Sequence, residues 1–534
     1  MINRKLLIGV GVALALTACN TDKLTEANKN PNDPENAPSA ALFTNSARVS
    51  AARWLDGVGG TRYGFLPQHL AEVQYPDDDT YQSSRLGAVA TSGLFDASYS
   101  AELQDLKLVM QRGKEANQPG LWAPPAILSS WEFGVLTDVF GAIPFTQALT
   151  PGITSPSYDP QKTVYDSLFL RLNAAADALA SASNELGTAG DPIYGGDPAS
   201  WRKFANSLRL RQAMRLTNVA AEAARVSSEV AAAVAASEGG LIDDNSENAK
   251  LVWPGDGVYD NPWANNFKGR DDHRISDRFL TIMSQWQDPR LAVLAMSITP
   301  ADTVHTNFVK NYCPTTTTCF SGLANALTQA QASPLVPNTS RPGAIFYPGV
   351  TSYGTFGGPG KSYPSYYFTA AETYFLLAEA AQRGIGGLTA GQAPNYYNLG
   401  ITRNMELLGI GSTTIATYLA RPGVAYTPGN AGLIQIATQK WIALYTDPIQ
   451  AWAEVRRTCQ PAIVQPGPSA RFNILPRRLQ YSNTDFSVNK VEYTKGVQQL
   501  TPQADAMTSR FYWDNSAGWS ASPTYQAGCS DRTS

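Results

Sequence analysis

Two glutamates seven residues apart are the strongest candidates for acid–base chemistry in this sequence. Glu372 and Glu379 fall on a helix predicted over 368–383, two turns apart and therefore on one face. Their backbones would be roughly 10 Å apart, whereas the carboxyl groups of a glycosidase lie about 5 to 9.5 Å apart, so a catalytic pair is possible. We favour a structural role, because buried glutamates usually pair with arginines of a neighbouring helix. The candidate partners are Arg209, Arg211, Arg215, Arg456 and Arg457.

Other catalytic and metal-binding motifs are absent from the sequence. It contains neither a G-x-S-x-G turn nor a phosphate-binding loop, and the spacing of its three histidines does not suit a metal. Three consecutive aspartates at 77–79 could hold calcium, but a solvated loop is the favoured interpretation. We therefore expect no catalytic residues, no metal and no cofactor.

Aromatic residues clustered in loop-rich segments offer chemistry of another kind. Rings exposed on loops stack against sugar faces or peptide side chains, while nearby Asn and Asp side chains bond hydroxyl groups. The candidate ligand-binding residues are Tyr75, Tyr81, Trp253, Tyr259, Trp263, Phe267 and Tyr353. The alternative is that these rings pack long loops onto the core, and both interpretations stay open at this point.

The start of the chain has the pattern of a bacterial lipoprotein leader. Arg4 and Lys5 precede an apolar run over 6–16, which is too short to span a bilayer of about 30 Å as a stable anchor. The sequence L-T-A-C then ends at Cys19. We expect removal of 1–18 and acylation of Cys19, which would attach the protein to a membrane by lipid alone.

The remaining cysteines are even in number, which predicts two disulfides in an exported protein. They are Cys313, Cys319, Cys459 and Cys529. Of the three possible pairings, the simplest joins the first to the second, around four threonines, and the third to the fourth, near the C-terminus. Zinc is the competing use, but a C-x₂-C pair is missing.

Charge and hydropathy restrict the partners. The formal net charge is −3, with acidic and basic residues nearly balanced. Binding to nucleic acid is therefore not expected, because it requires a basic surface. Beyond the leader the sequence has no run of 18 apolar residues, so the membrane contact should come from the lipid.

The elements that must position these residues are mainly helical. Apolar residues recur at three- and four-residue steps in 97–113, 163–183, 200–236, 276–285, 368–383, 395–408, 433–445 and 448–457. Such helices with short connections predict antiparallel hairpins, and few, short strands are expected.

The sequence divides into three parts. After the signal peptide over 1–18, a tether over 19–40 leads into a single helical domain over 41–534. Within that domain Gly, Pro, Asn and aromatic residues predominate over about 238–361, which predicts a loop-rich region.

Six blocks in a fixed order carry a resemblance to a known family. They are F-G-A-I-P-F at 140–145, G-G-D…W-R-K-F-A-N-S-L within 195–211, D-P-R-L at 288–291, A-E-T-Y-F-L-L-A-E-A at 371–380, Q-K-W-I-A-L with A-W-A-E-V-R-R within 439–457, and P-R-R-L at 476–479 followed by Tyr481 and Asn489. Together with the leader and the N-P-N sequence at 30–32, they resemble the SusD/RagB family of nutrient-binding outer-membrane lipoproteins, in its SusD-like branch.

The resemblance implies a fold and a partner. The fold would be an all-α scaffold of tetratricopeptide-like hairpins, with the loop-rich region at about 238–361 as its ligand face. The partner would be a SusC-type TonB-dependent transporter, over which the protein acts as a hinged lid at the cell surface of the outer membrane. Such proteins bind glycan or peptide without cleaving a bond. The alternative function is a surface glycan hydrolase on the same scaffold.

Overall fold

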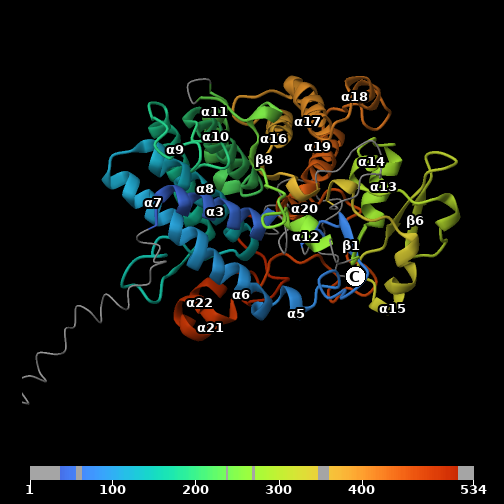
Figure 1. Cartoon of the computed structure of the whole chain (residues 1–534), viewed down its shortest axis with the longest axis horizontal. Coiled ribbons are helices and arrows are strands. Elements are labelled where there is room, and N and C mark those ends of the chain that lie inside the picture. The colour runs from blue at the N-terminus through green and yellow to red at the C-terminus, as the bar shows by residue number, and fades with distance from the viewer. Residues whose placement is uncertain (1–36, 56–62, 236–238, 268–270, 347–359, 515–534) are drawn as a thin grey trace, which may run out of the picture.

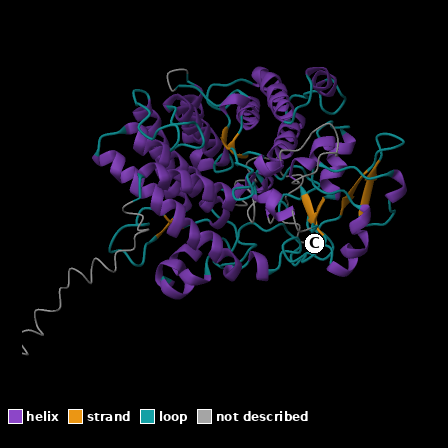
Figure 2. Cartoon of the chain, viewed as in Figure 1, coloured by secondary structure: helices purple, strands orange, loops and turns teal. Residues whose placement is uncertain are grey.

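The computed structural model describes residues 37–55, 63–235, 239–267, 271–346 and 360–514. Helices predominate in this part of the chain, and strands form only short pairs (Figure 1, Figure 2). The predicted all-α class is confirmed. The leader, Cys19, most of the tether, Tyr353 and Cys529 lie outside the described residues.

The N-terminal half is a series of helices that pack in chain order. They are α3 (Ser39–Ser50), η2 (Ala51–Leu55), α5 (Ser83–Leu86), α6 (Ala88–Ala97), η3 (Ser98–Leu103), α7 (Gln104–Glu115), α8 (Pro119–Phe140), α9 (Gln161–Leu179), α10 (Pro198–Arg215), η4 (Ala220–Glu222) and α11 (Ala223–Val234). α7 packs on α8, α8 on α9, α9 on α10 and α10 on α11. Each of these helices thus contacts the next, as in a row of helical hairpins.

Helix α8 is the longest of the described helices, and the helical periodicity does not predict it. It packs against α7, α9, α10 and α20, so nearly all of its side chains are buried. A helix that is covered on every side has no polar face and therefore no amphipathic pattern. Pro124 and Pro125 inside it weaken the sequence signal further.

The C-terminal half forms a second set of helices. They are α16 (Ala370–Arg383), η11 (Ala390–Gln392), α17 (Ala393–Leu407), α18 (Ser412–Leu419), α19 (Asn430–Ala443), η12 (Leu444–Thr446), α20 (Pro448–Thr458), α21 (Asn483–Val488) and α22 (Lys490–Val497). α16 packs on α17 and α19, and α19 packs on α20. Contacts of α10 with α16 and of α8 with α20 join the two sets, whereas α21 lies against α6.

The middle of the chain combines short elements with long loops, as its composition predicts. The helices are η6 (Asn245–Glu247), α12 (Pro262–Phe267), α13 (Asp277–Gln285), α14 (Leu291–Leu294), η7 (Pro300–Asp302), α15 (Gln329–Ala332), η8 (Ser333–Asn338), η9 (Ala344–Phe346) and η10 (Gly360–Ser362). The strands of the described chain are β1 (Leu70–Glu72), β2 (Ile143–Pro144), β3 (Tyr158–Asp159), β4 (Ala249–Leu251), β5 (His273–Ile275), β6 (Val309–Tyr312), β7 (Phe320–Leu323) and β8 (Ser365–Phe368).

The strands pair as four separate antiparallel ladders, β1 with β5, β2 with β3, β4 with β8 and β6 with β7. Two of these ladders join distant parts of the chain. Leu70 pairs with Ile275 in the first, and Leu251 pairs with Ser365 in the third. The ladders therefore attach the loop-rich region to the helical sets, and one hydrophobic cluster continues from Phe43 to Trp513.

Candidate functional site

Four of the candidate ligand-binding aromatics are core residues, so the prediction that they are exposed is wrong. They are Tyr81, Trp253, Trp263 and Phe267, all buried in the main hydrophobic cluster. The Trp263 ring stacks on Phe346 with centroids 4.8 Å apart, and its Nε1 donates to the carbonyl of Leu55 over 3.4 Å. These rings pack loops onto the core, which is the alternative that the sequence left open.

Tyr75 is the exposed ring of the N-terminal group, with 57% of its surface accessible. It lies in the turn after β1, ahead of the acidic run. The expectation of a solvated run is wrong for Asp78 and Asp79, which are both buried. Asn325 donates to Asp79 over 2.9 Å, and burial raises the pKa of Asp79 to about 7. These aspartates belong to the packing of the turn.

Trp253 and Tyr259 come together in a pocket of about 660 Å³. Three segments that are distant in sequence form its walls: 38–48 along α3, the loop 189–192, and the segment 251–259 that begins at the last residue of β4. The lining is mainly apolar. A volume of this size accommodates a ligand of a few rings.

The first wall is fixed by contacts between α3 and the loop at 190. The Thr44 hydroxyl lies 2.8 Å from the carbonyl oxygen of Ala40 and 2.9 Å from that of Gly190. A Cβ atom at residue 190 would lie 2.4 Å from the oxygen of Leu186 and 2.7 Å from the Cβ of Ala40. The close approach of loop and helix therefore requires glycine at this position.

Trp253 forms the rigid side of the pocket. Its Nε1 donates to the Ser365 hydroxyl of β8 over 2.6 Å, and only 3% of the residue is exposed. Because most of its ring is covered, Trp253 shapes the pocket and presents little surface for stacking.

Tyr259 is the accessible ring of the pocket, with 46% of its surface exposed. The turn that carries it is held by Asp256, which accepts from the backbone of Val258 at 2.9 Å and of Tyr259 at 2.8 Å. Asp260 accepts from the backbone of Gly257 over 2.8 Å and pairs with Lys361 at 3.7 Å. The ring is therefore positioned by its own turn and by the neighbouring η10 segment.

Within the described residues, Arg48 is the only charged residue in the lining of the pocket. Its guanidinium carbon lies 5.4 Å from the centroid of the Tyr259 ring, a cation–π contact. Its Nη2 donates to Oδ1 of Asn45 over 2.9 Å. The pocket thus combines an exposed ring with a cation and an amide.

Glu372 and Glu379, the two glutamates of the predicted helix, lie in the protein core, away from the pocket. Glu372 forms a two-bond pair with Arg211, at 2.8 and 2.6 Å, and Glu379 forms one with Arg457, at 2.7 and 2.6 Å. Both glutamates are buried in α16. The structural interpretation of this pair is confirmed, because each glutamate is buried and pairs with an arginine of another helix.

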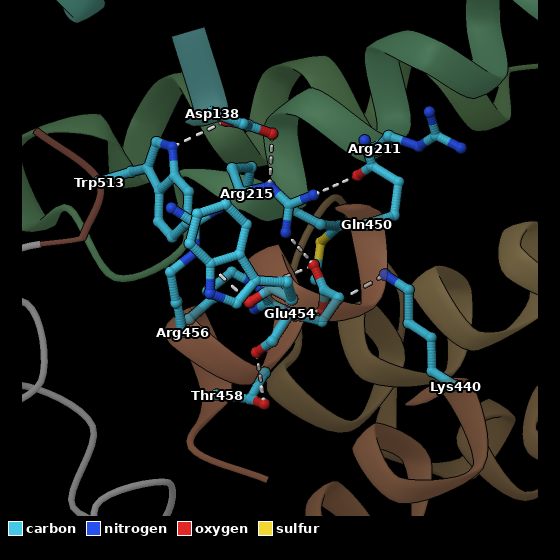
Figure 3. Close-up of polar contacts among 12 residues, drawn as sticks. Asp138, Arg211, Arg215, Lys440, Gln450, Glu454, Arg456, Thr458 and Trp513 are labelled. Carbon is cyan, nitrogen blue, oxygen red and sulfur yellow. Dashed lines mark hydrogen bonds and ion pairs between the residues drawn. The ribbon is translucent and has the colours of Figure 1, made fainter. Parts of the chain in front are cut away.

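These pairs belong to a larger network of buried charges between α8, α10, α16, α19 and α20, hereafter the core network. Its cations are Arg211, Arg215, Lys440 and Arg457, and its carboxylates are Asp138, Glu372, Glu379 and Glu454. Figure 3 shows Arg215 between Asp138, Gln450 and Glu454, with Lys440 reaching Glu454 from the other side.

Glu454 is the centre of the core network. It contacts Arg215, Arg457 at 2.6 Å and Lys440 at 3.3 Å. Burial alone would raise the pKa of Glu454, but Arg457, Lys440 and Arg215 outweigh it and hold that pKa well below its usual value. Glu454 is therefore ionised and balanced by its neighbours.

Three of the four cysteines that follow Cys19 lie in the described residues, and all three form disulfides. Cys313 and Cys319 form a disulfide that closes the loop of four threonines between β6 and β7. Cys459, at the end of α20, is also disulfide-bonded. Because Cys529 lies outside the described residues, its pairing with Cys459 stays a prediction. No cluster of three or more His, Cys, Asp or Glu residues suited to a metal ion occurs in the described ranges.

The sequence interpretation missed Arg48 and the loop 189–192. Arg48 is one polar residue among several in α3, and nothing in its spacing distinguishes it. Gly190 precedes the G-G-D block, but its role depends on the approach of α3 from elsewhere in the chain. Their meeting with Tyr259 is a result of the tertiary fold.

Comparisons with known proteins agree with this architecture. A family model named SusD-like, described as "Starch-binding associating with outer membrane", matches residues 31–482. Two similar solved structures are a chitin-binding protein (22% identity, TM-score 0.73, 89% of this chain and 100% of the other) and a chitin-binding SusD homologue from Flavobacterium johnsoniae (24%, 0.69, 89% and 97%). A SusD homologue from Bacteroides uniformis is 23% identical, with a TM-score of 0.71 over 89% of this chain and 99% of the other.

At these identities the similar structures establish the fold. None of the curated protein sequences matches the chain. Among the helices of the described residues, none has both the length and the apolar character needed to cross a membrane.

Proposed function

Because the chain belongs to the SusD-like family, described as starch-binding and associated with the outer membrane, we propose that it is a lipid-anchored nutrient-binding protein of the cell surface. Its ligand would be a glycan, or otherwise a peptide, which it would deliver to a SusC-type TonB-dependent transporter. Acylation of Cys19 would hold it at the membrane, and the folded part would act as a hinged lid over the transporter.

The pocket between α3, the loop 189–192 and 251–259 is the observation that carries ligand binding. It is large enough for a short oligosaccharide, and its walls are fixed before a ligand arrives by Thr44, Gly190 and Trp253. Preformed walls reduce the conformational entropy lost on binding. Tyr259 supplies an exposed ring on which the C–H face of a sugar can stack.

A glycan is favoured over a peptide by two observations. The proteins of similar structure with a stated ligand include two called chitin-binding. The pocket also presents the exposed ring of Tyr259, and a flat ring of this kind suits the C–H face of a sugar.

The mechanism that we propose is capture and release without bond cleavage. A sugar ring would stack on Tyr259 while Asn45 and Arg48 donate hydrogen bonds to its oxygens, and Trp253 would limit the depth of entry. The burial of Glu372 and Glu379 supports a binding role. Glu372 pairs with Arg211 and Glu379 pairs with Arg457, so neither carboxylate can reach a bound sugar.

A glycan and peptide array probed with the mature chain tests the ligand class. We expect oligosaccharide binding that falls about tenfold, roughly 1.4 kcal/mol, in Tyr259→Ala. Tyr75→Ala is the matched control, because it removes a similarly exposed ring away from the pocket. Equal losses in the two variants, or binding of peptides alone, would contradict a glycan pocket at this position.

The transporter partnership needs a separate experiment. Extraction of native outer membranes with mild detergent, followed by purification on a tag carried by this chain, should recover a large barrel protein in near-equal amount. Replacement of Cys19 by Ser should release the protein from the membrane. Recovery of the wild-type chain alone would contradict the lid role.

A further inference from the structure

Arg48 is a cation without a counter-charge in its pocket. The lining of the pocket, within the part of the chain that the structure describes, contains neither Asp nor Glu. Arg48 makes no ion pair with a carboxylate there; its contacts are the Asn45 amide and the Tyr259 ring. A guanidinium has five N–H donors, and the bond to Asn45 uses one of them.

The acidic residues that lie nearest in sequence to the lining are committed elsewhere. Asp191 accepts from the backbone of Ile193, Tyr194 and Gly196, and from Nε1 of Trp201 at 2.6 Å. Asp256 accepts from the backbone of its own turn, and Asp260 accepts from the backbone of Gly257 and pairs with Lys361 at 3.7 Å. None of the three forms an ion pair with Arg48, so the lining carries a net positive charge.

The position of Arg48 also favours recognition of a ligand. Its half-buried guanidinium lies over the exposed Tyr259 ring, and stacking of this kind holds the planar fork in one orientation. A fixed fork presents two parallel N–H donors to a carboxylate or a sulfate, which gives stronger and more directional bonds than neutral donors do. Tyr259 can contact the attached ring at the same time.

We propose that the pocket selects an acidic glycan, an oligosaccharide with a carboxylate or sulfate group that pairs with Arg48 while a sugar ring stacks on Tyr259. This inference rests on the proposed glycan-binding function and specifies its ligand class. The lining supplies no acceptor carboxylate for the hydroxyl groups of a neutral sugar, so the acidic group provides the main polar contact.

The test is a titration calorimetry series with paired probes on the mature chain. The acidic probes are oligogalacturonate, oligomannuronate and a sulfated oligosaccharide, and each is paired with its methyl-esterified or desulfated form. We expect at least one acidic probe to bind at least tenfold more tightly than its neutral partner, and its affinity to fall as salt is raised, because screening weakens charge pairing.

Variants of Arg48 locate the effect. Arg48→Gln should reduce affinity for that acidic probe by ten- to hundredfold and affinity for the neutral form by much less, because a neutral sugar loses only a neutral acceptor's hydrogen bond. Arg48→Lys should be intermediate for the acidic probe, because it keeps the charge and loses the planar guanidinium. Arg471→Gln is the matched control, since Arg471 also lies over a ring, that of Phe472 at 5.2 Å, outside the pocket.

The outcomes separate this inference from the function on which it rests. Preferred binding of the neutral forms, or an Arg48→Gln variant that binds acidic probes as the wild type does, overturns the acidic class and leaves glycan binding in place. Binding of no acidic or neutral glycan, with or without binding of an acidic peptide, overturns both.

Discussion

The core network and the pocket use arginine in opposite ways. In the core network Arg211, Arg215 and Arg457 are buried, and each contacts at least one carboxylate. In the pocket Arg48 is half-buried and meets a ring and an amide. A buried cation without a counter-charge is strongly unfavourable, so each arginine of the core network pairs with a carboxylate. A partly solvated cation is stabilised by water, so Arg48 can remain unpaired until a ligand binds.

Arg456 shows that contact with aromatic rings does not by itself indicate a binding site. It lies 3.7 Å from the ring centroid of Trp452 and 4.9 Å from that of Trp513, and donates to the carbonyl of Arg477 over 2.6 Å. Burial lowers the pKa of Arg456 to about 9, although Asp514 and Asp138 oppose that shift. Because it is fully buried, no ligand reaches it. Accessibility therefore distinguishes Arg48.

The largest expected effect comes from breaking the core network. Glu454→Ala removes the carboxylate shared by Arg215, Lys440 and Arg457, and should lower the free energy of unfolding by about 3–5 kcal/mol. Urea denaturation followed by tryptophan fluorescence measures the change. Glu406→Ala, which opens the exposed pair with Arg403, should lower it by only about 0–1 kcal/mol. A loss as large as that of Glu454→Ala would contradict the central position of Glu454 in the core network.

A second change should affect both regions at once. Gly190→Ala places a Cβ against Leu186 and Ala40, so we expect about 1–3 kcal/mol of destabilisation from overpacking and weaker ligand binding, because the loop must move from α3. The comparison variant is Gly93→Ala in α6, where a Cβ meets no atom within 4 Å. Unchanged stability and binding in Gly190→Ala would show that this wall is less rigid than described.

The pH dependence of stability should report on the core network. The folded protein lowers the pKa of Glu379 and Glu454, so below about pH 4.5 the unfolded chain binds more protons and stability is lost as the pH falls. Each such group contributes up to about 1.4 kcal/mol per pH unit. In Glu454→Gln the free energy of unfolding, measured by urea denaturation at several pH values between about pH 5 and pH 3, should therefore fall less steeply with decreasing pH than in the wild type. An equal dependence on pH in the two proteins would contradict the assignment.

The smallest expected effect on folding is that of Arg48→Gln. Since Arg48 makes no ion pair in the described chain and is only half-buried, the free energy of unfolding should change by less than about 0.5 kcal/mol. The same urea series measures it. A loss comparable to that of Glu454→Ala would mean that Arg48 belongs to the scaffold and would remove the distinction between the two regions.

The sequence was sufficient for the scaffold because its signals are local or belong to the family blocks. The periodicity around Glu372 and Glu379 indicated a packed helix, and the blocks that contain Arg211 and Arg457 indicated their role as partners. Helix α8 was not predicted, because a helix that is buried on every side has no amphipathic pattern.

The pocket was only half predictable. Trp253 and Tyr259 were singled out by clustering, but the same criterion selected Trp263 and Phe267, which are core residues. A ring on a loop serves packing and binding equally well in sequence, and only the fold shows which face is covered. Arg48 reaches Tyr259 across more than two hundred residues of chain, so no local pattern could reveal it.

Hydrogen exchange of the mature chain, with and without its tightest-binding oligosaccharide, tests the location of the ligand site most directly. Protection should appear in 189–192 and 251–259, next to Arg48 and Tyr259, and the turn that carries Tyr75 should exchange as before. Protection around Tyr75 with no change in these two segments would contradict a binding site at the pocket.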